Sequence, residues 1–347
     1  GLQAEALDFS ALGEEAFVPS TRTRSQAVFT LQELALGAAT LQAGARLERV
    51  AVHSAGDGGD AGAAVAKFGA PQTRRFQPRS LSLGMLVPLG AAGSGWQLSA
   101  TVGSTQRAPA YAELFANGLH VATGAFEQGD ASLQLERSRH AELGLHWQQA
   151  GHSLRAALWQ TRFAGYIALE ATGANVPVDN ADGSRSDLPV YRFTALPARL
   201  QGGEVEWRSR LDGMAWAPGW VLAAGAGLDW VRGDNLRSGQ PLPRIAPLRL
   251  LATLDAGRGP WRAGAQLRHA ARQGRVPADD SPTPAWTTLD LWAGWQQRLG
   301  SGADALWTLK LANLGDSLAY NASALPAARR VSPAGGRALQ AGLRLAF

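Results

Sequence analysis

Residues able to bind a metal ion gather in one polar stretch near the middle of the chain. His120 carries an imidazole, a ligand that suits zinc, copper, nickel and haem iron. Two carboxylates follow it, Glu127 and Asp130, and they could complete a site with the histidine. The pattern therefore predicts a loop that binds a metal or a metal-containing ligand. The alternative is that His120 only makes a hydrogen bond within the loop.

A second pair of possible ligands, His140 and Glu142, stands two residues apart in the alternating run that follows. Residues two apart in a β-strand point to the same face, so we expect these side chains to lie next to each other. They could provide a second binding step for the same ligand. The alternative is that both are polar wall residues bonded to neighbouring strands.

Strands with two different faces are predicted along most of the chain. Apolar and polar or small residues alternate in the runs 41–48, 96–103, 136–147, 261–268 and 338–347. About 14 such segments are present, and most are long enough to cross a bilayer when tilted. In a membrane barrel one face of each strand meets lipid and the other meets the lumen. His140 and Glu142 are then expected on the lumen face.

The connections between these segments alternate in length, which favours a membrane barrel over a soluble sandwich. Short links are predicted at 35–38, 88–95, 149–152, 211–219, 256–260 and 299–304, and longer ones at 53–74, 105–130, 170–196, 231–243, 270–284 and 315–335. Outer-membrane barrels have short periplasmic turns and long extracellular loops. Many of the 12 tryptophans fall near the ends of apolar runs, where an interfacial aromatic girdle would lie. We therefore predict an all-β, transmembrane antiparallel barrel with the 105–130 loop outside the cell.

Composition excludes several other classes. Cysteine is absent, which removes disulfides and thiolate chemistry. The 33 basic residues are spread along the chain rather than gathered in a patch, so no nucleic-acid partner is expected. On a barrel, arginines could instead meet the phosphates of outer-membrane lipid and lipopolysaccharide. No Gly-x-Ser-x-Gly elbow is present and no histidine has a recognisable catalytic context, so we predict that the chain is not an enzyme.

Several motifs, taken in order, resemble the C-terminal barrel of TonB-dependent outer-membrane receptors across essentially the whole chain, 1–347. They are Arg107-Ala108-Pro109, Glu113-Leu114-Phe115, Glu136-Arg137-Ser138 before Glu142-Leu143-Gly144-Leu145, Leu309 to Leu314, Tyr320, Gly336-Arg337 and the final Phe347. The resemblance implies a barrel of about 22 strands with an N-terminal plug. We expect the plug and the first strands to lie outside this chain, so that the chain is a C-terminal fragment. A complete 14-stranded barrel is the alternative.

The same resemblance supplies expected roles and partners. Arg107 and Pro109 would be structural, and Phe347 resembles the terminal aromatic residue read by the barrel assembly machinery. The plug would engage the TonB–ExbB–ExbD complex, which energises uptake. Segments similar to a zinc-uptake branch are found at 10–19, 118–124, 126–130, 191–193 and 201–206. The chain is thus expected to take up a scarce metal such as zinc, with no resident cofactor. A haem or siderophore receptor of the same family and a passive porin are the alternatives.

Overall fold

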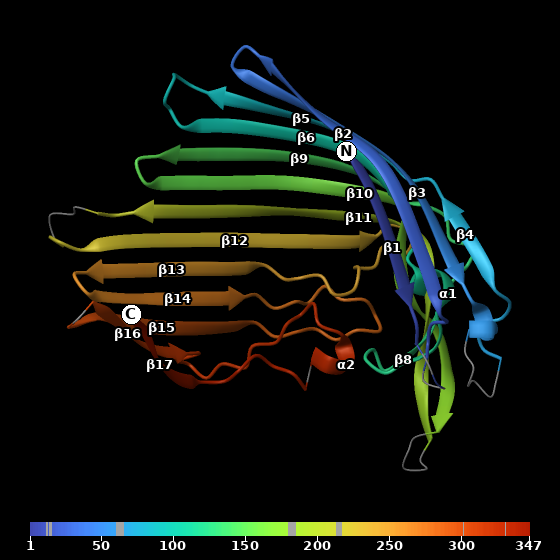
Figure 1. Cartoon of the computed structure of the whole chain (residues 1–347). Helices are drawn as coiled ribbons and strands as arrows, with labels where there is room; N and C mark the ends of the chain where they lie inside the picture. Colours follow the sequence, from blue (N-terminus) through green and yellow to red (C-terminus); the bar gives the residue numbers. More distant parts are fainter. Residues whose placement is uncertain are drawn as a thin grey trace.

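The fold is described from a computed structural model and is built almost entirely from strands (Figure 1). The structure describes residues 1–11, 13, 16–59, 66–179, 185–212, 217–300, 302–329 and 331–347. In these residues the chain forms one 17-stranded sheet and two short α-helices. None of the described helices is long and apolar enough to cross a membrane. The predicted all-β fold is therefore confirmed.

The elements follow one another along the chain with few interruptions. Their bounds are β1 (Leu2–Phe9), β2 (Thr21–Leu36), β3 (Ala39–Ser54), the 3₁₀ turn η1 (Gly56–Gly59), β4 (Gln72–Phe76), β5 (Arg79–Leu89), β6 (Trp96–Arg107), α1 (Tyr111–Phe115), β7 (Asn117–His120), β8 (Ala125–Gln128), β9 (Glu136–Gln149), β10 (His152–Asp179), β11 (Arg185–Arg210), β12 (Val221–Asn235), β13 (Arg249–Arg258), β14 (Trp261–Ala270), β15 (Trp286–Leu299), β16 (Ala303–Ala312), α2 (Pro326–Arg329) and β17 (Ala338–Ala346).

Long strands pair antiparallel with their neighbours along the chain. β4 and β5 both pair with β3 and form one strand, which is interrupted at Gln77 and Pro78. Proline has no amide hydrogen to donate to the ladder, which explains the break. With β4 and β5 counted together, and the short β7 and β8 set aside, 14 long strands remain in the described residues. This number agrees with the sequence-based count.

The register keeps the apolar residues of neighbouring strands on one face. Leu98 on β6 pairs with Leu145 on β9, and Leu143 on β9 pairs with Leu158 on β10. These apolar side chains are exposed on the isolated chain, with Leu143 at 59% and Leu158 at 63% of full exposure. An apolar sheet face of this kind is what a lipid-facing surface requires. We call it the apolar face, and the opposite side of the sheet the polar face.

The two ends of the strands differ, as the connection lengths predict. Tight turns join β2 to β3, β9 to β10 and β13 to β14, whereas α1, α2, β7 and β8 all belong to connections at the other end (Figure 1). Tryptophans gather next to the tight turns: Trp96 lies 5.7 Å from Trp147, and Trp261 lies 5.6 Å from Trp295 between ring centroids. We call these two ends the turn end and the loop end.

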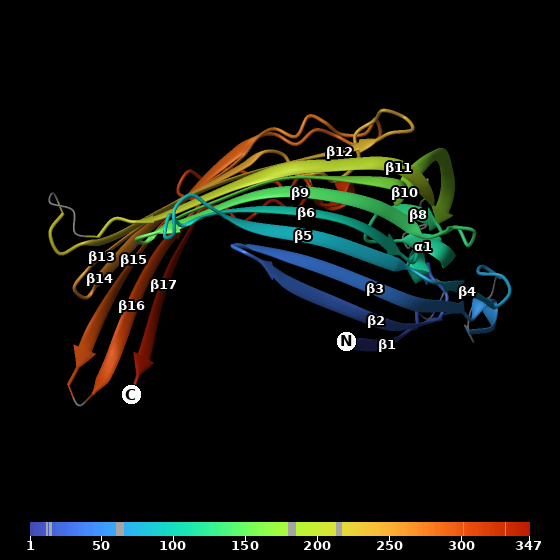
Figure 2. The same ribbon diagram turned by 90° about the horizontal axis from the view of Figure 1, so that it is seen from above.

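The sheet curves strongly but remains open (Figure 2). β1 pairs with β2 and β17 pairs with β16, and in the described part of the chain no ladder joins β1 to β17. The curvature and the open edges are those of a segment of a barrel wall. Buried apolar side chains gather mainly at the loop end, where Phe76, Leu114, Phe115 and Ile167 pack together.

One predicted loop was wrong. The link expected at 170–196 is in fact the continuation of β10 and β11, which stay paired from Tyr166 and Leu196 out to Asp179 and Arg185. Two register shifts, after Phe163 and after Ala171, accompany this extension. Cross-strand pairing keeps this segment extended in a long hairpin, where tertiary context outweighs the local preferences of its residues. The extended hairpin carries the β11 residues that contact β8.

Candidate functional site

His120 and Glu127 lie together in a small hairpin at the loop end of the sheet. β7 and β8 form this hairpin, with His120 opposite Ala125 and Gly118 opposite Glu127. The His120 Nδ1 atom lies 2.9 Å from Glu127 Oε1. Thr123, in the turn, donates a hydrogen bond of 2.8 Å to the same carboxylate oxygen. The structure therefore brings this histidine and this carboxylate together.

Packing fixes the orientation of both side chains. The His120 ring stacks on Phe17, with centroids 4.1 Å apart and planes 8° from parallel. Glu127 is almost fully buried, whereas the His120 side chain keeps 32% of its exposure. β8 also runs parallel to β11, where Glu127 pairs with Tyr191. An imidazole edge that is held rigidly and is partly open to solvent can meet a ligand arriving at the loop end.

Asp130 does not join this pair. Its carboxylate accepts hydrogen bonds from the amide and the hydroxyl of Ser132, at 2.8 and 2.6 Å. Its amide donates to the Glu113 carbonyl in α1. Within the described residues no group of three or more histidine, aspartate, glutamate or cysteine side chains is arranged to hold a metal ion. The metal role of His120, Glu127 and Asp130 stays a prediction.

His140 and Glu142 share one face of β9, the face opposite Leu143. His140 Nε2 lies 3.7 Å from Glu142, and His140 Nδ1 lies 2.9 Å from the Thr161 hydroxyl on β10. The Trp159 ring lies 6.5 Å from the His140 ring. His140 thus contacts neighbouring wall residues as well as Glu142, and the role of the pair as a second binding step stays a prediction.

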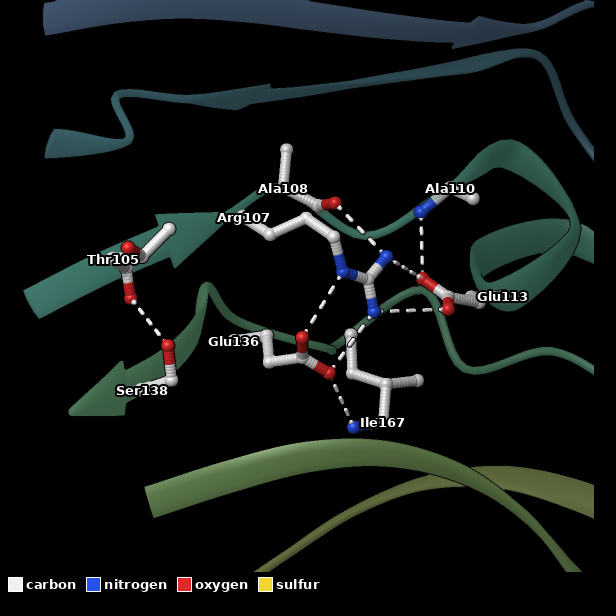
Figure 3. A network of polar contacts seen from close by, with 8 residues as sticks. All are labelled: Thr105, Arg107, Ala108, Ala110, Glu113, Glu136, Ser138 and Ile167. Atoms are coloured by element: carbon white, nitrogen blue, oxygen red, sulfur yellow. Dashed lines mark hydrogen bonds and ion pairs between the residues drawn. The ribbon is translucent and has the colours of Figure 1, made fainter. Parts of the chain in front are cut away.

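Arg107 stands at the end of β6 and joins several elements at the loop end (Figure 3). Its guanidinium donates to both oxygens of Glu113, at 2.8 and 3.1 Å, and to both oxygens of Glu136, at 3.1 and 3.0 Å. Glu113 also accepts the Ala110 amide at the start of α1, and Glu136 accepts the Ile167 amide on β10. One arginine therefore ties β6, α1, β9 and β10 together.

The surroundings of Arg107 favour the charged form of its guanidinium. Burial alone would lower the pKa of Arg107, but the hydrogen bonds that it donates to Glu136 and Glu113 outweigh burial and raise the pKa. Pro109, two residues on, is fully buried, which suits a fixed strand exit. Phe347 at the other end of the chain is 99% exposed.

Sequence reasoning missed a pocket beside the β7–β8 hairpin. It has a volume of about 430 Å³, and its polar lining includes Lys67, Asn117, Gln128, Asp130 and Arg192. Arg192 on β11 donates to Gln128 on β8 at 2.9 and 3.2 Å, which holds one wall in place. These residues come from four separate segments of the chain, so no local motif could have revealed them. A larger hollow of about 1350 Å³ lies over β11–β15.

Comparison with known proteins places this architecture in a family. Residues 4–314 match the family described as "TonB dependent receptor-like, beta-barrel". The copper transporter OprC is similar in structure, with a TM-score of 0.73 and 20% identity over 93% of this chain and 48% of its own. The FrpB iron transporter from Neisseria meningitidis follows, with a TM-score of 0.63 and 15% identity over 94% of this chain and 46% of its own.

The ferric-catecholate import receptor Fiu from E. coli K12 is similar too, with a TM-score of 0.58 and 17% identity over 94% of this chain and 44% of its own. The chain thus spans about half the length of these proteins. At such identities the similarity concerns the fold alone, and the zinc branch is not singled out. The family match covers most of the sequence, and the chain belongs to the β-barrel family of TonB-dependent receptors.

Proposed function

We propose that this chain is the C-terminal barrel wall of an outer-membrane receptor that takes up a scarce nutrient with energy supplied through TonB. The observation that carries the proposal is a wall of 14 long strands with an apolar face, tight turns at one end and folded connections at the other. The family match over residues 4–314 supports it. Plug, remaining strands and the TonB–ExbB–ExbD contact belong to the part of the protein beyond this chain.

Orientation follows from the same architecture. Outer-membrane barrels place short turns in the periplasm and long loops outside the cell. The loop end, with α1, the β7–β8 hairpin and the pocket beside it, then faces the medium. The paired tryptophans at the turn end lie at the periplasmic interface, where aromatic rings are favoured. A nutrient would first meet His120, Arg192 and their neighbours.

The nutrient is proposed to be a metal ion or a metal chelate. Similar structures carry the names of copper, iron and ferric-catecholate transporters. His120 supports this reading because its imidazole is partly exposed while Glu127 and Phe17 hold the ring in place. A carboxylate that hydrogen-bonds one ring nitrogen orients the other toward a metal or ligand atom. Zinc remains one candidate among these metals.

Uptake by cells that produce the full-length protein tests the proposal. Cells are given radioactive zinc, copper or iron as the free ion. Radioactive iron is also given as a ferric catecholate and as haem. We expect one of these to accumulate, and His120→Ala to reduce accumulation about tenfold or more, as the loss of a metal ligand or of its hydrogen-bond partner does. His53→Ala is the matched control, because His53 also stands at the loop end and bonds a threonine, Thr73.

Each result has a definite meaning. Accumulation of none of these forms contradicts the proposed nutrient class. Equal uptake by His120→Ala and the control removes His120 from the ligand site but leaves the receptor proposal standing. Uptake of a ferric catecholate or haem alone, without any free ion, assigns the alternative function. A stable open-channel conductance of the purified full-length protein would support a porin instead.

A further inference from the structure

Three arginines stand directly opposite one another on three adjacent strands. Arg139 on β9 pairs with Arg162 on β10, and Arg162 pairs with Arg199 on β11. We call these three residues the arginine row. Directly opposed residues in a sheet have side chains about 5 Å apart, and like charges at such positions are destabilising. The row therefore concentrates positive charge that a nearby anion would relieve.

Among the described residues, carboxylates neutralise one end of the row and leave the other without an ion pair. Asp234 on β12 pairs with Arg199 and accepts its hydrogen bond at 2.9 Å, but it also receives Arg232 and, at 2.7 Å, Arg275. One carboxylate thus serves three guanidinium groups. Arg162 donates to the neutral Gln160, and Arg139 forms no ion pair with any residue in the described part of the chain. Both side chains are exposed.

The row lies on the apolar face, not in the lumen. Alternation puts Arg139 on the same side of β9 as Leu143, and Arg162 on the same side of β10 as Leu158. Arg199 likewise shares its side of β11 with Val205, which is 43% exposed. On this face Ala141 stands between Arg139 and Leu143, and Gln160 stands between Arg162 and Leu158. The exposed apolar residues begin beyond this intermediate level, farther toward the turn end.

The height of the sheet between the turn end and the arginine row matches the apolar thickness of an outer membrane. From Trp147 at the turn end of β9 to Arg139, eight residues correspond to about 26 Å along the strand. Tilted by about 40°, the strand rises about 20 Å, close to the apolar band of about 25 Å that surrounds such barrels. The backbone of the arginine row therefore stands near the outer edge of the apolar band, and long arginine side chains can extend from there to the headgroups of the outer leaflet.

We propose that the arginine row, with Arg232 beside it, binds the phosphate groups of a lipid in the outer leaflet. Planar guanidinium groups bind phosphate oxygens through paired, charge-assisted hydrogen bonds, which lysine cannot reproduce. The exposed Leu143 and Leu158 below the row would contact the acyl chains of the same lipid. The exposed apolar side chains farther along the same face are the reason for choosing a lipid rather than a soluble anion. The inference rests on the proposed outer-membrane location but not on the nutrient.

Native mass spectrometry of the full-length protein in detergent tests this site. The probes are bisphosphorylated lipid A, its phosphate-free form and inorganic phosphate. We expect lipid A to bind at least about tenfold more tightly than the phosphate-free form, because only the former offers charge-assisted partners. Millimolar inorganic phosphate should not displace it. Equal binding of both lipids would overturn the proposal, and displacement by inorganic phosphate would reassign the row to soluble anions.

Variants locate the binding on the protein. Arg139→Gln combined with Arg162→Gln should weaken lipid A binding about tenfold or more. Arg155→Gln combined with Arg208→Gln is the matched control, since both arginines lie on the polar face of β10 and β11. Equal lipid binding by both double variants would overturn the site. If the first variant fails to fold, the comparison of the two lipids on the unaltered protein still decides whether the protein recognises the phosphates of lipid A.

The lipid result is separable from the proposed function. Loss of nutrient uptake with lipid binding retained would contradict the receptor proposal alone. Nutrient uptake without a preference for the phosphorylated lipid would contradict this inference alone.

Discussion

Replacing Arg107 by methionine removes the guanidinium that joins four elements at the loop end. Methionine keeps most of the length of the side chain, so the change mainly deletes the charge and the hydrogen bonds to Glu113 and Glu136. These two carboxylates are only 15% and 12% exposed and would face each other without a cation. Removing one partner of a buried ion pair costs about 3–5 kcal/mol.

The free-energy cost expected for Arg107→Met is smaller than this. The Arg107 side chain is 42% exposed, so water screens part of the interaction. We therefore expect about 2 kcal/mol, which corresponds to a roughly 30-fold increase in local opening. Because Glu113 caps α1 and Glu136 holds the Ile167 amide, the opening should appear in α1 and around Ile167.

Amide hydrogen exchange of the full-length protein in detergent measures this opening. Arg237→Met is the matched control, because Arg237 is an exposed loop-end arginine whose side chain donates to a single carbonyl, that of Ala195. Adding Glu113→Gln and Glu136→Gln to Arg107→Met should restore part of the protection, since it removes both unpaired charges. Unchanged exchange in the single variant, or a further loss in the triple variant, would refute the reasoning.

Three further predictions concern the loop end. Arg329→Met breaks an ion pair with Asp280 in which each side chain is 5% exposed. The loss should destabilise the surrounding loops by about 3–5 kcal/mol, which would be measured as faster amide exchange there. Amide exchange unchanged from the parent protein would contradict this. The backbone amides of Phe68 and its neighbours donate hydrogen bonds to the Asp57 carboxylate and lower its pKa. The ionised carboxylate therefore stabilises the loop fully above the ordinary pKa of about 3.9, and this stabilisation is lost as the pH falls through the lowered pKa. Asp57→Asn should therefore speed exchange of these amides at neutral pH, and protection that stays the same would argue against the role of the carboxylate. Gly129→Ala would place a Cβ atom 2.6 Å from the backbone of α1. The substitution should therefore displace β8 and weaken ligand binding at the loop end. A variant with the parental melting temperature and the parental affinity for the nutrient would rule this out.

The strands could be predicted from the sequence because their pattern is local. Alternation in runs such as 96–103 fixes two faces, and tight turns fix which strands are neighbours. Pairing such as that of Leu98 with Leu145 then follows from keeping apolar residues on one face. The break at Pro78 is also local, since proline cannot donate to the ladder.

The loop end could be predicted only in part because its contacts join distant segments. His120 and Glu127 meet in a hairpin within the segment that the sequence predicts only as a loop. The Asp130 carboxylate points to Ser132 and away from that pair. Its position depends on the close contact of Gly129 with the backbone of α1. The contact between Arg192 and Gln128 needs the long extension of β10 and β11, a segment that the sequence analysis predicts to be a loop.

If TonB supplies the energy for uptake, cells with and without TonB should differ in accumulation of the nutrient. Accumulation of the radioactive nutrient is measured for the full-length protein in both strains, with passive entry measured in cells that lack the receptor. We predict accumulation above the passive level only where TonB is present and the inner membrane is energised. Equal accumulation in both strains would contradict the claim.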